Sequence, residues 1–204
     1  MNSGFQFGLT VESCQDWQVI NWPVSHPTLI DGDLLLRVWE SADAQFLLES
    51  CQESAIQEFT TVPVPYTLAN ASDFIENVAN WFDREESMGL VGCISGQPAL
   101  SVALHHVNKF DHAIEIGYWV ASDFRGSGLG ARAAKLLTDY AFAIGFRRVE
   151  ALTDPENIGS QKTLTAAGFE FENILRQKLT RWDGTQIDAL VYSKFPPVDP
   201  KNFK

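Results

Sequence analysis

A dense run of glycines within the segment YWVASDFRGSGLGARAAKLL, residues 118–137, constrains this chain more than any other feature. Gly126, Gly128 and Gly130 fall within five positions, and Arg125 comes directly before them. The residues ahead of this turn are strand-like, and those after it recur at helical spacing. Glycines before a helix expose backbone N–H groups, and the helix N-terminus adds partial positive charge. The segment therefore predicts an anion site, above all for phosphate or pyrophosphate.

Two nucleotide-binding motifs can be compared with this turn. A P-loop requires GxxxxGK[ST], and none of these glycines is followed by that lysine and hydroxyl. The dinucleotide pattern G-x-G-x-x-A fits Gly126, Gly128 and Ala131, and Glu150 lies near the distance expected for a ribose-binding acid. However, ASDFR separates the turn from its strand, whereas dinucleotide-binding glycines follow their strand directly. A nicotinamide-dependent oxidoreductase remains a less favoured alternative.

The remaining hydrophobic pattern predicts one α/β (α+β) domain around a largely antiparallel sheet. A strand at 33–40 precedes two helices, the second with apolar positions between Phe74 and Phe82 at helical spacing. Three strands then form a meander that ends at the glycine turn, with a hairpin loop at Gly96-Gln97. A helix, a strand, a short helix and a final hairpin around Asp183-Gly184 complete the order. Only the unit at 113–152 requires a parallel strand pair.

Composition and charge exclude several classes of protein. The chain has 204 residues, 45% of them hydrophobic, which is enough for one sizeable core. A formal net charge of -11 argues against nucleic-acid binding and allows attraction of a cationic or amine-bearing partner. We found no apolar run that could span a membrane and no signal-peptide pattern, so we expect a cytoplasmic protein that does not bind membranes.

Cysteines and histidines show no pattern typical of a disulfide framework or a metal site. Cys14, Cys51 and Cys93 are scattered, which favours reduced thiols. His105, His106 and His112 lie close together in sequence, but they lack a helical i,i+4 pair and nearby cysteines. We therefore interpret them as strand-end and turn residues and expect no metal.

A family resemblance enters at the glycine turn. RGSGLG matches the R/Q-x-x-G-x-G/A signature of the GNAT superfamily of N-acetyltransferases at Arg125, Gly128 and Gly130. The segments IEIGYWV and EALTDPENIGSQKTLTAAGFE resemble the ribosomal-protein (RimJ/RimL-like) type. The resemblance implies a GNAT domain over 33–197, after an N-terminal extension (1–32) and before a C-terminal tail (198–204). It also implies a mostly antiparallel mixed sheet with flanking helices and a central splayed parallel strand pair.

The resemblance implies acetyl-coenzyme A as co-substrate, with its pyrophosphate in the glycine turn. The pantetheine arm would run along the backbone of the preceding strand, and Asn157 would bond it. Ser160 would lie near the sulfur and protonate or stabilise the thiolate. Helix capping is the alternative role for Asn157. The predicted coenzyme-binding residues are Trp119, Val120, Arg125, Gly126, Ser127, Gly128, Leu129, Gly130, Asn157 and Ser160.

Glu115 is our candidate for the base that accepts the proton of the amine. Strand alternation puts it on one face with Gly117 and Trp119, and a carboxylate beside tryptophan can be partly desolvated. The alternative is an ordinary surface carboxylate. Many GNAT relatives place a general-acid tyrosine where this chain has Leu164, so the role of acid passes to Ser160 or water. No cysteine has the surroundings of a nucleophile, which predicts direct attack in a ternary complex.

We expect the acceptor to be a primary amine, either a protein or peptide N-terminus or a small molecule. A non-catalytic acyl-coenzyme A-binding module is the alternative outside enzymes, because it would keep the turn and Asn157 without needing Glu115. A homodimer is compatible with the resemblance.

Overall fold

The computed structural model describes residues 19–181 and 184–197. Its strands are β1 (Leu29–Asp31), β2 (Leu34–Arg37), β3 (Ser87–Ile94), β4 (Gln97–Asn108), β5 (Ala113–Val120), β6 (Arg148–Thr153), β7 (Glu170–Thr180) and β8 (Gln186–Lys194). Its helices are α1 (Ala44–Ser50), α2 (Ser54–Phe59), α3 (Leu68–Asp83), α4 (Leu129–Ala143) and α5 (Ile158–Ala166). Short 3-10 helices cover Ser41–Asp43 and Ser122–Phe124.

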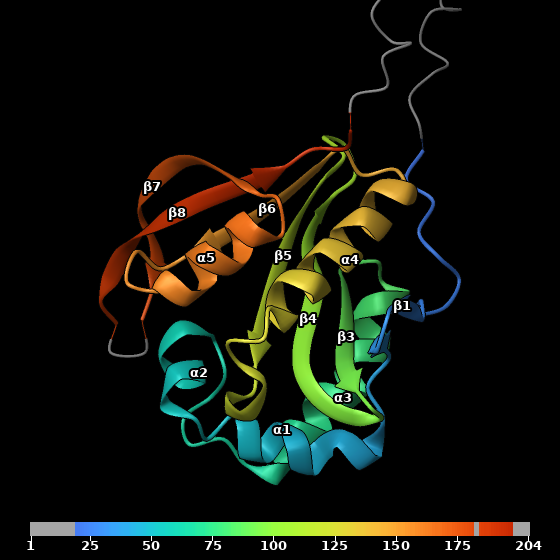
Figure 1. Cartoon of the computed structure of the whole chain (residues 1–204), viewed down its shortest axis with the longest axis vertical. Coiled ribbons are helices and arrows are strands. Elements are labelled where there is room, and N and C mark those ends of the chain that lie inside the picture. The colour runs from blue at the N-terminus through green and yellow to red at the C-terminus, as the bar shows by residue number, and fades with distance from the viewer. Residues whose placement is uncertain (1–18, 182–183, 198–204) are drawn as a thin grey trace, which may run out of the picture.

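These strands form one sheet in the order β1-β2-β3-β4-β5-β6-β8-β7 (Figure 1). Of these neighbouring strands only β5 and β6 are parallel, and they pair over three positions that end at Glu115 and Glu150. Beyond that point β5 keeps β4 on one edge as far as Val120, while β6 continues beside β8. The mixed, mostly antiparallel sheet and its splayed central pair are therefore confirmed.

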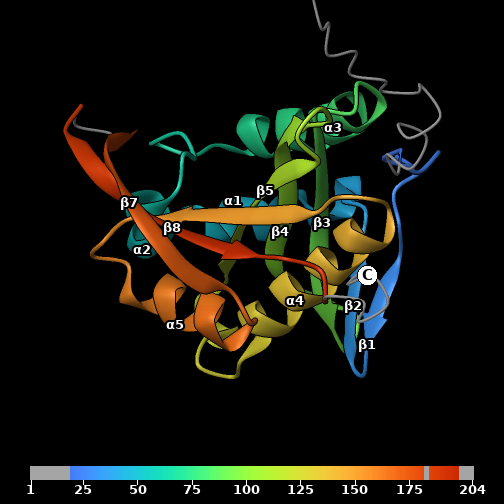
Figure 2. The ribbon, with the colours of Figure 1, turned by 90° about the horizontal axis from the view of Figure 1, so that it is seen from above.

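Helices cover the sheet on both faces (Figure 2). In the larger core, α4 and the Leu164 side chain of α5 pack against one face of the sheet. A second cluster lies under α1, α2 and α3, where Ala71 and Val78 of the amphipathic helix are buried with Trp39. Thr67 and Asn70 start that helix, because each side chain accepts a hydrogen bond from the backbone N–H of the other.

The structure differs from the sequence-based predictions in three elements. The hairpin loop between β3 and β4 is Ser95-Gly96, not Gly96-Gln97, because Ile94 pairs with Gln97 and both loop residues have positive φ. Helix α2 was not predicted, since its six residues are too few for a helical period to be visible. Residues 29–31, in the predicted N-terminal extension, add β1 to the sheet. The predicted final hairpin is present, but Asp183 lies outside the described residues.

Among the described helices, none combines the length and the apolar character that crossing a membrane would require.

Candidate active site

The glycine turn has the conformation that an anion site needs. Gly126 and Gly128 have φ of +76 and +78, and a Cβ at either position would meet nothing within 4 Å. Gly128 is the N-cap of α4, so the first N–H groups of a 15-residue helix begin there. Gly130 serves packing instead, because a Cβ would lie 3.2 Å from side-chain atoms of Val120 and Thr163. The turn therefore combines open space, exposed amides and a helix N-terminus.

Arg125 fastens this turn to its surroundings. Its Nε donates to the carbonyl oxygen of Val120 at 2.8 Å, and its guanidinium is ion-paired with Glu53. Glu53, the N-cap of α2, also accepts a hydrogen bond from the N–H of Ser122 at 3.0 Å. In the structure the charge of Arg125 is therefore neutralised by a carboxylate of the protein itself.

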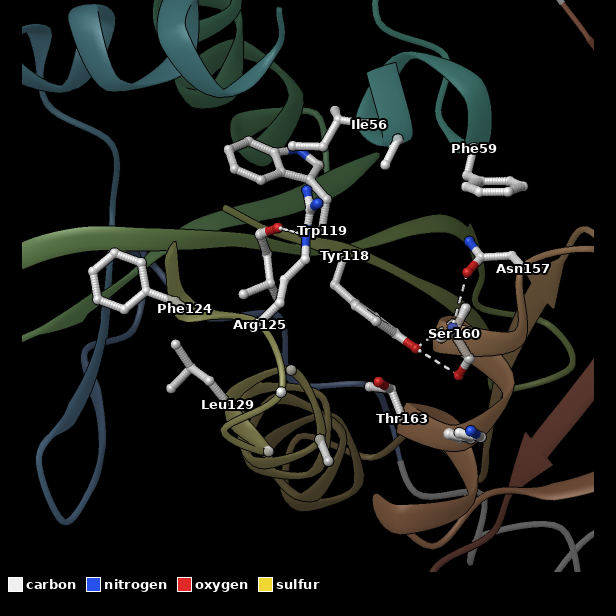
Figure 3. Close-up of a pocket in the computed structure, with 18 of the residues that line it drawn as sticks. Ile56, Phe59, Tyr118, Trp119, Phe124, Arg125, Leu129, Asn157, Ser160 and Thr163 are labelled. Carbon is white, nitrogen blue, oxygen red and sulfur yellow. Dashed lines mark hydrogen bonds between the residues drawn. The ribbon is translucent and has the colours of Figure 1, made fainter. Parts of the chain in front are cut away.

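A cavity of about 550 Å³ opens between the glycine turn, the splayed end of β5, α2 and α5 (Figure 3). All predicted coenzyme-binding residues except Ser127 line it; Ser127 turns its hydroxyl to the carbonyl oxygen of Phe124, at 2.7 Å. Ile56 and Phe59 of α2 form the opposite wall, and Lys162 of α5 contributes a cation. The structure thus brings together segments about a hundred residues apart in sequence.

Asn157 and Ser160 lie at the start of α5. The side-chain oxygen of Asn157 accepts the N–H of Ser160 at 2.9 Å, so Asn157 is the N-cap, the alternative role considered for it. It also lines the cavity. Because its oxygen serves the cap, its amide N–H groups are what it can offer to a ligand. Capping and ligand contact, which were treated as competing roles, are thus geometrically compatible.

Tyr118 was missed by sequence reasoning. Its hydroxyl lies 3.1 Å from Oγ of Ser160 and 3.2 Å from that residue's carbonyl oxygen. Strand alternation puts Tyr118 on the face opposite Glu115, together with the buried Ile114 and Ile116. Burial raises the pKa of Tyr118 to about 12, although hydrogen bonds with Ser160 and Thr163 oppose the shift. A protonated phenol therefore reaches the cavity from β5 (Figure 3). Leu164, in contrast, is fully buried in the core.

Glu115 lies outside this cavity, as the described lining residues do not include it. Its carboxylate is 3.0 Å from Nδ1 of His106 and 3.9 Å from Nε2 of His105, and its side chain is 19% exposed. The predicted neighbour Trp119 instead packs against Phe46, with ring centroids 5.7 Å apart. Burial lowers the pKa of His105, so this imidazole is neutral at pH 7. The Glu115 carboxylate is thus partly shielded from solvent, but by histidine side chains and not by tryptophan.

The three histidines lie near the end of β4 and in the turn that follows it, as their interpretation as strand-end and turn residues predicts. His112 is the structural residue that was expected, with Nδ1 donating to the carbonyl oxygen of Gly145 at 3.0 Å. His105 and His106, in contrast, converge with Glu115 so that one potential ligand atom from each lies within 4.8 Å of the others. The spacing rules for metal sites overlooked them because the third group comes from another strand.

The dinucleotide alternative finds no support in this geometry. The strand before the turn is the end of an antiparallel meander, and a 3-10 helix at Ser122–Phe124 separates it from the glycines. Glu150, the candidate ribose-binding acid, is ion-paired with Arg148 on β6. Neither feature matches a doubly wound dinucleotide fold.

Comparison with known proteins agrees with the architecture. Residues 33–170 match the family model described as acetyltransferase (GNAT) domain. An uncharacterized N-acetyltransferase of Bacillus licheniformis, p20, is 28% identical over 171 residues, which are 81% of this chain and 94% of p20.

Solved structures show the same fold at low identity. RimL, a ribosomal L7/L12 alpha-N-protein acetyltransferase in complex with coenzyme A, has a TM-score of 0.77 and 18% identity, covering 85% of this chain and 100% of that one. The microcin C7 self-immunity acetyltransferase MccE, in complex with acetyl-CoA and AMP, has a TM-score of 0.73 and 20% identity, covering 81% and 94%. Because the family model spans more than half of the sequence, the chain belongs to the GNAT family of acetyltransferases, which use acetyl-coenzyme A as co-substrate.

Proposed function

We propose that this chain moves the acetyl group of acetyl-coenzyme A to a primary amine by direct attack in a ternary complex. The observation that carries the proposal is the cavity that joins the glycine turn to the Tyr118–Ser160 pair along the splayed end of β5. An anion site at one end and hydroxyl groups at the other match a long thioester with a diphosphate at its far end.

The coenzyme would bind in two parts. Its pyrophosphate accepts hydrogen bonds from the backbone N–H groups at the start of α4, where Gly126 and Gly128 leave open space. Its pantetheine arm lies in the gap between β5 and β6 and pairs with backbone groups of Trp119 and Val120, as an added strand does. Asn157 donates to the arm through its amide, and Lys162 offers the phosphates a full positive charge in addition to the partial charge of the helix N-terminus.

The leaving sulfur would meet the pair of hydroxyl groups. When the Tyr118 O–H donates a hydrogen bond to Oγ of Ser160, the serine O–H is free to donate toward the thiolate. The raised pKa of Tyr118 keeps its phenol protonated throughout the neutral range. The two hydroxyls therefore stabilise the thiolate as the C–S bond breaks, and a proton delivered through this pair completes the free thiol.

Glu115 would accept the proton of the amine. An alkylamine has a pKa of about 10 and must lose a proton before or during attack on the thioester carbon. Since Glu115 does not line the coenzyme cavity, it acts from the acceptor side, directly or through water. The new C–N bond forms as the C–S bond breaks, and the proton lost by the amine goes to the carboxylate.

The cysteines support direct transfer. Cys51 and Cys93 are buried, and burial raises the pKa of the Cys51 thiol to about 11 and also raises that of Cys93. A thiol of this kind is a poor nucleophile at neutral pH, because the thiolate is the reactive form. Cys14 lies outside the described residues.

The acceptor is an amine of a protein N-terminus or of a small molecule. RimL is described as an alpha-N-protein acetyltransferase, and MccE as a self-immunity enzyme against a microcin. The chain's net charge of -11 favours either kind of cationic acceptor. The site would act in the cytoplasm, where acetyl-coenzyme A and ribosomal proteins are found.

The test is release of free thiol from acetyl-coenzyme A with a panel of peptide N-termini and small amines. We expect turnover with at least one class and a loss of about 100-fold in kcat for Glu115→Gln, as is usual when a general base is removed. Ser160→Ala should also lower kcat while acetyl-coenzyme A still binds. Tight binding of the coenzyme without turnover on any amine would favour the non-catalytic binding module.

A further inference from the structure

A compact group of three metal-ligand side chains lies on the sheet away from the coenzyme cavity. Nδ1 of His105 and Nδ1 of His106 are 3.2 Å apart, and Nδ1 of His106 is 3.0 Å from Oε2 of Glu115. In this arrangement a single proton on Nδ1 of His106 would face both Nδ1 of His105 and Oε2 of Glu115. We propose that these residues form a binding site for a divalent transition metal ion, with Zn²⁺ as the best-fitting member of that class.

An irregularity in β4 builds this site. Two consecutive strand residues normally point to opposite faces of a sheet. Here the register between β4 and β5 shifts by one residue between the His105–Glu115 pair and the Asn108–Ala113 pair, which is a β-bulge. His106 within it has φ of +51, a left-handed conformation that histidine adopts more readily than most residues. As a result, His106 turns its Nδ1 toward the Glu115 carboxylate, next to the ring of His105.

The spacing of the ligand atoms suits a metal ion. Zn²⁺ binds histidine nitrogen and carboxylate oxygen at about 2.0–2.1 Å, so two ligands of a tetrahedral site lie about 3.3 Å apart. Two of the three separations, 3.2 and 3.0 Å, are close to that value, and the third pair, His105 and Glu115, lies within 4.8 Å. Two histidines and one carboxylate also form a recognised three-ligand set that leaves positions for water.

The surroundings leave the group both supported and accessible. The His105 ring lies over Gly117, where a Cβ would be 3.0 Å from its Nε2, so the glycine makes room for it. The side chain of His106 is 76% exposed, which gives an ion a path from solvent. Glu150 pairs with Glu115 in the parallel register, but its carboxylate is held by Arg148.

Metal binding would also affect acetyl transfer, and this one point rests on the proposed function. An ion coordinated by Glu115 withdraws the carboxylate that we propose as the base. Zn²⁺ would then inhibit acetyl transfer without weakening acetyl-coenzyme A binding, because the cavity at Tyr118 and Ser160 lies apart from the three ligands. The ion is thus an inhibitor of the transferase rather than a cofactor.

The test measures metal binding by the full chain, free of any purification tag and without acetyl-coenzyme A. Calorimetric titration with Zn²⁺ is expected to give one site per chain, and Co²⁺ should give the intense visible absorption of a four-coordinate ion. His106→Asn keeps a residue that tolerates positive φ, and Glu115→Gln keeps the shape of the side chain. Each should weaken binding at least about 10-fold, because a ligand is lost.

Two further variants make the test specific. His112→Asn removes an imidazole elsewhere and retains a donor for the Gly145 carbonyl, so it should bind the ion as the wild type does. Gly117→Ala keeps all three ligands but displaces the His105 ring, and it should weaken binding while circular dichroism remains unchanged.

Absence of saturable Zn²⁺ binding by the wild type would overturn the proposal. Equal affinity in His106→Asn and Glu115→Gln would overturn it too. Binding is measured without amine or coenzyme, so failure of the transferase assignment would leave these results unaffected.

Discussion

Strand β5 leads through a short 3-10 helix to the glycine turn and carries Glu115 near its other end, and these two regions are built in different ways. The turn is local: Arg125, Gly126, Gly128 and Gly130 are consecutive or nearly so, and their conformations follow from residue type. The cluster around Glu115 depends on a bulge in β4 and on strand register. A local motif can be read from a sequence, whereas a bulge is decided by the pairing of two strands.

The two regions also differ in how they handle charge. The turn relies on backbone N–H groups, and its arginine is neutralised by Glu53. The other region gathers ionisable side chains within a few ångströms of one another. Backbone N–H groups carry fixed partial charges, whereas imidazole and carboxylate groups can exchange protons. Substitutions in and between the two regions can therefore separate coenzyme binding from proton transfer.

The largest expected effect comes from Gly128→Val. A β-branched side chain at φ of +78 is strained, and it would project into the open space of the cradle. We expect acetyl-coenzyme A to bind about 100-fold more weakly by isothermal titration calorimetry, well beyond the loss of one hydrogen bond. Gly96→Val is the matched control, because Gly96 also has positive φ (+80) and open space around it but lies in the β3–β4 hairpin. Equal coenzyme affinities in the two variants would contradict a phosphate cradle at the turn.

Tyr118→Phe should lower kcat by about 30-fold, less than is common for a general acid, because Ser160 and water can still donate. The dissociation constant for acetyl-coenzyme A should change little, since the ring stays in place. Steady-state kinetics with calorimetry can separate the two quantities. Tyr140→Phe, at a partly buried position on α4 away from the cavity, is the control. An unchanged kcat in Tyr118→Phe would show that the hydroxyl pair has no part in thiolate departure.

The buried phenol also predicts a loss of stability in alkali. The pKa of Tyr118 is about 12 in the fold and 10 when unfolded, so between these values the native state binds more protons. The free energy of unfolding therefore falls as pH rises through this window, by about 1.4 kcal/mol for one such group at pH 11. Urea unfolding at pH 8 and pH 11 measures this fall in the free energy of unfolding. In Tyr118→Phe the fall should be smaller by about 1.4 kcal/mol. Identical pH dependence in both proteins would contradict the burial argument.

Glu53→Gln should have the smallest effect. It removes the carboxylate that neutralises Arg125, so the guanidinium gains freedom to approach a phosphate. We expect about 3-fold tighter binding of acetyl-coenzyme A at low salt, because partly exposed ion pairs are weak. The gain should shrink as ionic strength rises. Weaker binding instead would indicate that the Glu53–Arg125 pair holds the turn in its binding conformation. Glu86→Gln, in an ion pair with Arg84 remote from the cavity, is the control.

The order of elements and the turn were predictable because their signals are local. Alternation in 113–120, helical spacing after Gly128 and the N-terminal signals of α5 each depend on neighbouring residues. Short α2 and the one-residue displacement of the β3–β4 loop were not predictable in this way, since six residues show no period and the loop depends on cross-strand register.

The sequence by itself determined the family, the mostly antiparallel sheet with one parallel pair, and the glycine turn at the start of α4, because glycine conformations and helix N-termini are properties of adjacent residues. Only the tertiary structure decided that Tyr118 forms a hydrogen bond with Ser160 and that Glu53 forms an ion pair with Arg125. It also decided that His105 and His106 lie close to Glu115. These contacts join strands and helices far apart in the chain. Their distances depend on packing and register, for which no short stretch of sequence carries a signal.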